Sequence, residues 1–223
     1  MLLPFRDRTQ AGQLLAAELK PRYANLPNVV VLALPRGGVP VAFEIARELR
    51  APLDVLIVRK LGVPGQEELA LGAIASGGAR VLNQDLVESL KISDRIIDSI
   101  TAREQQRLQE REQAYRDSRP PYPVSGHIVI LVDDGLATGA TMLAAIRAVR
   151  TQKPERIIVA VPVAAPRVYE SFLPEVDDII CLATPQPFLG VGQWYEDFSQ
   201  VSDQHVRNLL EKASEWATTE ARR

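Results

Sequence analysis

Two adjacent carboxylates, Asp133 and Asp134, stand between an apolar run and a loop of small and hydroxyl residues. The segment 128–141 reads IVILVDDGLATGAT. Carboxylates accept hydrogen bonds well from vicinal sugar hydroxyls, but they are poor partners for a phosphate. The small residues that follow lead into a helix start, where unpaired backbone N–H groups and the positive end of the helix dipole favour a phosphate. The spacing therefore predicts a site that contacts a sugar and its phosphate with neighbouring residues.

The loop from Ala137 to Thr141 would supply the phosphate contacts. Gly139 permits a close backbone approach or a positive φ angle. The hydroxyls of Thr138 and Thr141 can donate to phosphate oxygens, and Ala140 completes the turn into the helix. A plainer interpretation stays open, in which Asp-Asp-Gly is a turn and Thr141 caps a helix. The loop lacks the lysine of a P-loop, and no Gly-x-Gly-x-x-Gly turn follows a strand, so neither nucleotide-binding pattern is supported.

A second segment has the same organisation. Residues 29–42 read VVVLALPRGGVPVA, an apolar run, a tight loop and a helix start. Gly37 and Gly38 would let backbone amides face an anion, and Arg36 would add a charge-assisted contact. An ordinary strand-to-helix turn with a surface arginine is the alternative. Arg59 and Lys60 end another apolar run, where cations would face the same crevice or simply lie on the surface.

Short apolar runs alternate with helical stretches, which is typical of a parallel sheet covered on both faces. The expected strands are Val29 to Leu34, Leu53 to Val58, Ile128 to Val132, Ile157 to Val161, Ile179 to Leu182 and a short one near Arg80 to Leu82. The expected helices are about Arg8 to Tyr23, Val39 to Leu49, Thr141 to Thr151 and Asp203 to Ala217. We therefore expect an α/β fold with a mostly parallel, Rossmann-like sheet flanked by helices, in one domain over residues 1–223.

Residues 93–118 differ from the rest, because their apolar positions are sparse among Arg, Glu and Gln. The pattern predicts a long, mostly solvated helix capped by Ser93, with apolar positions Ile96, Ile100, Leu108 and Tyr115. Prolines 120, 121 and 123 would end it, since proline has no backbone N–H. A functional or oligomer contact is the alternative for this helix.

The composition limits the partners. A hydrophobic content of 46% supports one substantial core, whereas a net charge of −2 and a pI near 5.8 argue against nucleic acid or an anionic membrane. No apolar stretch approaches the ~20 residues of a membrane span, and the N-terminal segment becomes charged too early for a signal peptide. The one cysteine, Cys181, lies in an apolar run expected to be buried and fits a reducing compartment. We expect a cytoplasmic protein.

The run from Ile128 to Thr141 resembles the phosphoribosyl-pyrophosphate signature of type I phosphoribosyltransferases: apolar residues, two acids, and a loop ending Thr-Gly-x-Thr. The segment 29–42 is similar to the pyrophosphate loop of that family, in which the peptide before a glycine is often cis, so the resemblance marks the Arg36–Gly37 bond. It further implies pyrophosphate contacts for Arg36, Gly37, Gly38, Arg59 and Lys60.

The same resemblance implies a core over about residues 29–182 and a small C-terminal hood over about 183–200 that holds the base. Aromatic residues gather there, and stacking on a base or packing in a satellite core would both explain them. The hood candidates are Phe188, Trp194, Tyr195 and Asp197, the last reading a base N–H or capping a turn. Residues 62–78 resemble in position the mobile loop that closes over the substrates. Glu67 and Glu68 would be either lid residues of this loop or charges that face solvent, and we expect the latter.

The resemblance implies displacement of pyrophosphate from ribose C1 by a base nitrogen, in purine or pyrimidine salvage. The expected ligands are phosphoribosyl pyrophosphate, Mg²⁺ and a nucleobase-like acceptor, and family habit favours a homodimer. Asp133 and Asp134 would hold the ribose hydroxyls, directly or through the metal. Two alternatives stay open: a non-catalytic regulator that senses phosphoribosyl pyrophosphate or a nucleotide, and a phosphosugar hydrolase. Neither His127 nor His205 is an evident general base, and Asp134 or the bound substrate itself stays open for that role. The sequence does not specify the acceptor.

Overall fold

A five-stranded parallel sheet forms the centre of the computed structural model, which describes residues 3–116 and 119–220. Its strand order is β2-β1-β6-β7-β8. The strands are β1 (Val29–Ala33), β2 (Leu53–Val55), β6 (Ile128–Val132), β7 (Arg156–Val163) and β8 (Asp178–Ala183). Every residue of β1 and of β6 is buried, which explains why both strands are continuous apolar runs without alternation. The predicted α/β class and parallel sheet are confirmed.

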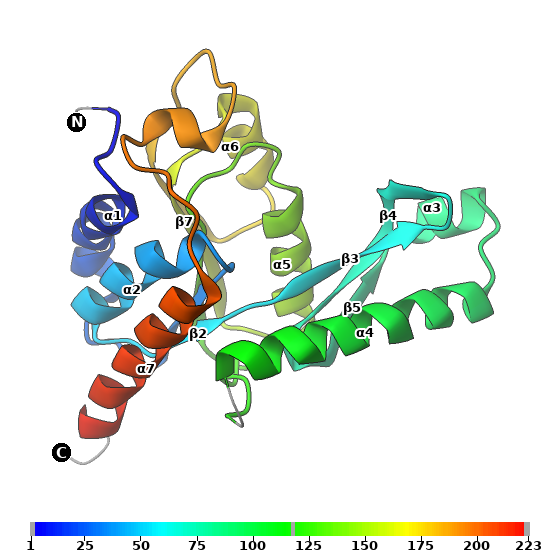
Figure 1. Cartoon of the computed structure of the whole chain (residues 1–223), viewed down its shortest axis with the longest axis horizontal. Coiled ribbons are helices and arrows are strands. Elements are labelled where there is room, and N and C mark those ends of the chain that lie inside the picture. Colours follow the sequence, from blue (N-terminus) through cyan, green and yellow to red (C-terminus); the bar gives the residue numbers. More distant parts are fainter. Residues whose placement is uncertain (1–2, 117–118, 221–223) are drawn as a thin grey trace.

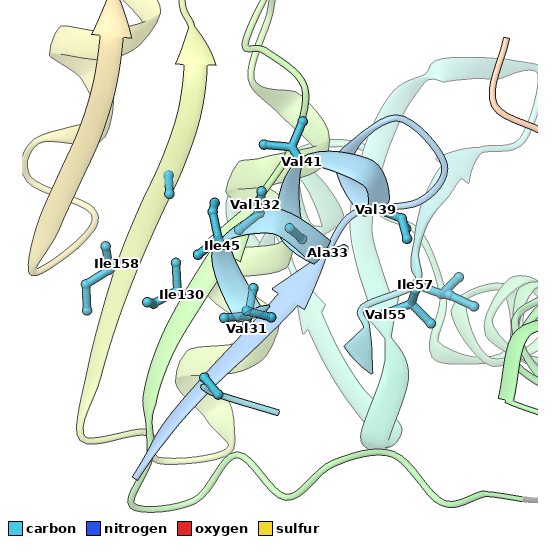
Figure 2. Packing of buried hydrophobic residues seen from close by; sticks show 14 of the residues in the cluster. Val31, Ala33, Val39, Val41, Ile45, Val55, Ile57, Ile130, Val132 and Ile158 are labelled. Carbon is cyan, nitrogen blue, oxygen red and sulfur yellow. The ribbon is translucent and has the colours of Figure 1, made fainter. Parts of the chain in front are cut away.

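Helices cover both faces of this sheet (Figure 1). On one face lie α1 (Arg8–Tyr23), α2 (Gly38–Leu49) and α7 (Asp203–Glu220), and on the other α5 (Ala140–Thr151) and α6 (Pro166–Phe172). Figure 2 shows Val41 and Ile45 of α2 above Val31, Ile130 and Ile158 of three neighbouring strands, all in one buried cluster. Two α-helices were not predicted from the sequence, α6 and α3 (Gln84–Ser89), and both are shorter than two full helical turns.

The strand order reverses direction between β1 and β6, which are neighbours in the sheet although they are far apart in the sequence. The helix that follows β1 is α2, on one face, and the helix that follows β6 is α5, on the opposite face. After the carboxyl ends of β1 and β6, the chain therefore continues toward opposite faces of the sheet. Such a switch point opens a crevice at the carboxyl edge of a parallel sheet, where ligands bind.

A second, antiparallel sheet extends away from the first (Figure 1). It consists of β3 (Val58–Val63), β4 (Gln66–Ala75) and β5 (Ala79–Leu82), and the helix α4 (Asp94–Arg116) lies along it. Two predictions were wrong here. The expected strand 53–58 is divided into β2 and the first residue of β3, and the expected mobile loop 62–78 is mostly strand. Pro64 and Gly65, with φ of 77° at Gly65, form a two-residue hairpin turn that brings Val63 opposite Gln66.

The helix α4 agrees with the predicted long charged helix, although residues 117–118 lie outside the described part of the chain. Its buried apolar residues are Ile97, Ile100, Leu108 and Tyr115, whereas Ile96, one of the apolar positions named from the sequence, is 41% exposed. Glu104 and Arg116 are buried as well. The helix is therefore less solvated than its composition indicates. The side chains of Glu67 and Glu68 also lie outside the described residues.

Within the described ranges, none of the helices combines the length and the apolar character that crossing a membrane requires. The other predicted elements agree with the structure to within a few residues at each end. Cys181, expected to be buried, lies on β8 and is half-buried.

Candidate active site

The loop after β6 forms an open helix N-terminus. Gly139 is the N-cap of α5, with φ of 71°, and a Cβ atom there would stand 2.6 Å from Cε2 of Phe172. Glycine is therefore required at this position by its backbone conformation and by its contact with α6. Thr141 lies inside the helix, so the alternative that it caps α5 is wrong. Gly139 has no side chain to cap the helix, and Ala137, Thr138, Ala140 and Thr141 are at the surface. The Ala140 N–H donates to the Thr138 hydroxyl over a long 3.5 Å, so the helix start is open to an anion.

The loop after β1 lies against the carboxylates. A Cβ atom on Gly37 would stand 2.0 Å from Oδ2 of Asp134, and one on Gly38 would stand 2.9 Å from Cα of Asp133. The loops of segments 29–42 and 128–141 therefore meet in the structure. The cis peptide is Pro35–Arg36, one bond before the expected Arg36–Gly37 bond. The Arg36 guanidinium is about one-third exposed and lies 3.9 Å from Asp203, at the start of α7.

Arg8 holds Asp134 by an ion pair of 2.8 Å, with side chains only 11% and 15% exposed. The guanidinium also lies 3.9 Å from the Phe198 ring centroid and donates to the Ser199 carbonyl at 2.9 Å. Asp133 Oδ1 accepts the Asp134 backbone N–H at 2.9 Å. Burial, together with the charge of Asp134, raises the pKa of Asp133. Burial likewise raises the pKa of Asp134, although Arg8 opposes this shift.

The aromatic residues of the expected hood pack into a small core of their own. Tyr195 is 6% exposed, and its Oη donates to the Asp134 carbonyl at 2.7 Å. Phe188 and Trp194 are half-buried against the same cluster, and the Trp194 Nε1–H is buried without a partner among the described residues. The Asp197 carboxylate accepts the Ser199 backbone N–H at 2.9 Å. These contacts agree with the satellite-core and turn-capping alternatives for the hood residues.

Arg59 and Lys60 lie near the start of β3, in the antiparallel sheet. Arg59 donates twice to Glu104 of α4, at 2.8 and 3.1 Å, whereas Lys60 is exposed. Both line a cavity of about 390 Å³ that Thr141 also lines. The two cations therefore border the loop after β6, and Arg59 is already paired with the Glu104 carboxylate. Of the two histidines, His127 lies before β6, at the opposite end of that strand from Asp133, and His205 borders Arg8 in a polar cavity of about 440 Å³.

A family model named phosphoribosyl transferase domain matches residues 7–171, which is most of the chain and includes the loops after β1 and β6. This chain belongs to the phosphoribosyl transferase family. Two curated proteins from strains of Mycobacterium tuberculosis, named "Putative phosphoribosyl transferase" Rv0571c and MT0597, are each 46% identical to it over 211 residues. The matches cover 94% of this chain and 47% of each relative, so the chain spans about half the length of those proteins.

The crystal structure of TT1426 from Thermus thermophilus has a TM-score of 0.83 and 44% sequence identity to this family member. The match covers 96% of this chain and 100% of that chain. The likeness therefore extends beyond the two loops to the arrangement of nearly the whole chain.

In this phosphoribosyl transferase family member, Arg8 and Glu104 were not predicted from the sequence. Arg8 stands 126 positions before Asp134, and Glu104 stands 45 positions after Arg59. No local spacing could indicate either pair. The one available signal for Glu104 was its position between arginines, because Arg103 directly precedes it and Arg107 follows three positions later. For Arg8, only its position at the start of a predicted helix was evident.

The carboxylates suit a magnesium ion that arrives with a phosphorylated substrate. Mg²⁺ is often held by one or two carboxylates together with substrate phosphate oxygens and water. Asp133 is the better candidate, since Asp134 is paired with Arg8. In the described residues, no group of three or more His, Cys, Asp or Glu side chains is arranged to hold a metal ion. The remaining ligands would therefore come from the substrate and from water.

Proposed function

We propose that this protein binds phosphoribosyl pyrophosphate and transfers its 5-phosphoribosyl group to a nucleobase-like acceptor, with release of pyrophosphate. The observation that carries the proposal is the meeting of Asp133 and Asp134 with both anion-binding loops at the switch point between β1 and β6. A sugar that carries phosphates at two ends needs this combination, hydroxyl acceptors in the middle and N–H donors on either side.

Each group has a separate role in this mechanism. The backbone N–H groups and hydroxyls of residues 137–141 hold the 5-phosphate, and Asp133 with Asp134 orients the ribose hydroxyls. The diphosphate is held by Arg36, the Gly37 and Gly38 amides, and the cations Arg59 and Lys60. Charge develops on the leaving group and on the sugar as the C1–O bond breaks, so fixed donors and charges stabilise the transition state without a protein nucleophile. Mg²⁺, where bound, would neutralise further charge on the leaving diphosphate.

The acceptor is a flat base in this proposal, contacted by residues 188–197. The burial of Tyr195 and the packing of Phe188 and Trp194 favour a contact with the edge of the base over stacking of the base between exposed aromatic side chains. This packing also supports a second candidate, a phosphosugar hydrolase that uses the same loops with water as the acceptor. A non-catalytic sensor of phosphoribosyl pyrophosphate is the third candidate. Cytoplasmic location, nucleobase salvage, a single domain and a homodimer belong to the proposal as well.

Calorimetric titration tests the proposal directly. Phosphoribosyl pyrophosphate with Mg²⁺ is titrated into the wild-type protein, into an Asp133→Asn, Asp134→Asn double variant and into an Asp177→Asn control. Asp177 immediately precedes β8 and accepts the Ile157 N–H, at the opposite edge of the sheet from the crevice. We expect binding to wild type and control and its loss in the double variant. An absence of binding to wild type would refute the proposal.

A panel of bases then separates the three candidates. A transferase consumes phosphoribosyl pyrophosphate only when its base is present, and the product is a nucleoside monophosphate. A hydrolase consumes it without any base and releases ribose 5-phosphate. A sensor binds it in the titration and consumes none under either condition.

A further inference from the structure

Three arginines of α4, Arg103, Arg107 and Arg111, recur at four-residue spacing and so lie on one face of the helix. We call them the α4 arginine stripe. Two cavities border it, one of about 390 Å³ and one of about 350 Å³, and both include Arg59 and Arg107 in their walls. The stripe extends for about 12 Å at the rise of an α-helix. It therefore borders the two cavities over a length greater than one phosphate.

Each of the two cavities lies next to one loop of the proposed site. The first cavity is lined by Thr141 of the phosphate loop, and the second by Asp203, which lies 3.9 Å from Arg36 of the other loop. Tyr115, in the wall of the second cavity, donates to the same Asp203 and joins α4 to the start of α7. The stripe therefore faces the gap between the loops and not an unrelated part of the surface.

Glu104 fixes the first two arginines of the stripe. Its carboxylate, 6% exposed, accepts hydrogen bonds from Arg59 at 2.8 Å, Arg107 at 2.9 Å and Arg103 at 3.3 Å. Burying a carboxylate is costly unless it is well paired. One carboxylate cannot use all the donors of three guanidinium groups, each with five N–H donors. The remaining donors of Arg103 and Arg107, each 55% exposed, are directed by this contact and stay available to a ligand.

Positive charge exceeds negative charge in the first cavity, where Arg59, Lys60, Arg103 and Arg107 are opposed by Glu104 alone among the described lining residues. A single solvated arginine would need no explanation. Four cations gathered around one cavity repel one another, and a bound polyanion would relieve that repulsion. The chain as a whole has a net charge of −2, so this excess is local.

We propose that the α4 arginine stripe is part of the diphosphate-binding surface and holds the leaving group of the reaction in cis, beyond the contacts of residues 36–38. This proposal rests on the proposed function for the identity of the reaction. It makes Arg107, which borders both cavities, the central binding residue of the stripe, and it makes Glu104 a positioning residue. Since the protein itself supplies these cations, inorganic diphosphate should bind to the stripe even when no divalent metal is present.

The test is calorimetric titration of inorganic diphosphate, in EDTA, into the wild-type protein and two variants. Arg107→Gln removes the central cation. Arg95→Gln removes an equal charge from the same helix, at a position that lines neither cavity. We expect Arg107→Gln to weaken diphosphate binding about tenfold, the effect of one charge-assisted hydrogen bond, and Arg95→Gln to change it less than about twofold. Thermal unfolding of each variant shows whether the fold is kept.

A parallel titration with ribose 5-phosphate separates this proposal from the function it rests on. Weaker diphosphate binding with unchanged ribose 5-phosphate binding in Arg107→Gln supports the stripe. Equal diphosphate affinity in wild type and Arg107→Gln would overturn it, even if ribose 5-phosphate binds as proposed. If wild type binds diphosphate through Arg107 but does not bind ribose 5-phosphate or phosphoribosyl pyrophosphate, the proposed function fails and the anion site remains.

Discussion

The backbone of Gly37 is in direct contact with the Asp134 carboxylate, since a Cβ atom on that glycine would stand 2.0 Å from Oδ2. Gly37 precedes α2 and Asp134 follows β6, so the contact joins the two loops across the switch point of the sheet. Arg8 approaches the same carboxylate from α1. Asp134 is therefore enclosed by backbone and by an opposite charge.

Replacing Gly37 by alanine should displace this carboxylate. We expect Gly37→Ala to weaken ribose 5-phosphate binding at least about tenfold and to lower the free energy of unfolding by about 1–3 kcal/mol, because the added methyl group overpacks a closed site. Gly190→Ala is the matched control, since a Cβ atom there has nothing within 4 Å. Calorimetry and urea unfolding measure both effects. Equal affinities for wild type and Gly37→Ala would mean that this contact does not matter for binding.

Removing Arg8 should leave Asp134 without its counter-charge in a mostly buried site. We expect Arg8→Gln to lower the free energy of unfolding by about 3 kcal/mol, as for other buried pairs that lose one partner, and to weaken ribose 5-phosphate binding. Arg6→Gln removes an ion pair whose arginine side chain is 63% exposed and should cost less than about 1 kcal/mol. Urea unfolding of the two variants compares them, and similar losses would contradict the importance of Arg8.

The contribution of Glu104 to stability should depend on pH. Burial opposes ionisation of Glu104, but hydrogen bonding and charge from Arg59, with Arg107 and Arg103, outweigh it and lower the pKa. A lowered pKa in the folded state means that the stabilisation is complete above the usual value of 4.5 and is lost as pH falls through the folded-state pKa.

We therefore expect Glu104→Gln to lower the free energy of unfolding by about 2 kcal/mol near neutral pH, and the difference from wild type to shrink below about pH 4.5. Urea unfolding across this pH range measures it. Glu110→Gln, on the exposed part of the same helix, should show a small difference at every pH. A Glu104→Gln difference that grows on acidification would show that the sign of the pKa shift is wrong.

Cys181 should react slowly in the folded protein. Burial raises the pKa of its thiol to about 11, and the thiolate is the reactive form. At pH 8 we expect reaction with a disulfide reagent to be about 100-fold slower than for the same chain unfolded in guanidinium chloride. Rapid labelling of the folded protein would contradict both the burial and the pKa.

The elements that carry the site were predictable because each has a strong local pattern. The runs at β1 and β6 are buried throughout and carry only apolar residues, and the loops after them contain glycines that the backbone requires. The parallel sheet follows from these patterns, and the rule that ligands bind at the carboxyl edge indicated which loops could form the site. The contact of Gly37 with Asp134 is visible only in the structure.

The antiparallel sheet was not predicted, because residues 62–78 have a composition that fits a loop, and pairing between strands supplies the stability that single residues do not. The Pro64-Gly65 turn was the signal that could have indicated the hairpin. The contacts of Arg8 and Glu104 depend on tertiary packing alone. The hood aromatics show the same limit, because composition alone does not distinguish a ring that faces a ligand from a ring that faces a core.

The ion pair between Arg8 and Asp134 has a consequence for the order of folding. Its partners are 126 positions apart, and Tyr195, which bonds the Asp134 carbonyl, is 61 positions further along the chain. Contacts at such separations close large loops and form after local structure. The carboxylate pocket should thus be among the last regions to become native, and the recovery of ligand binding during refolding should lag behind the burial of β1 and β6.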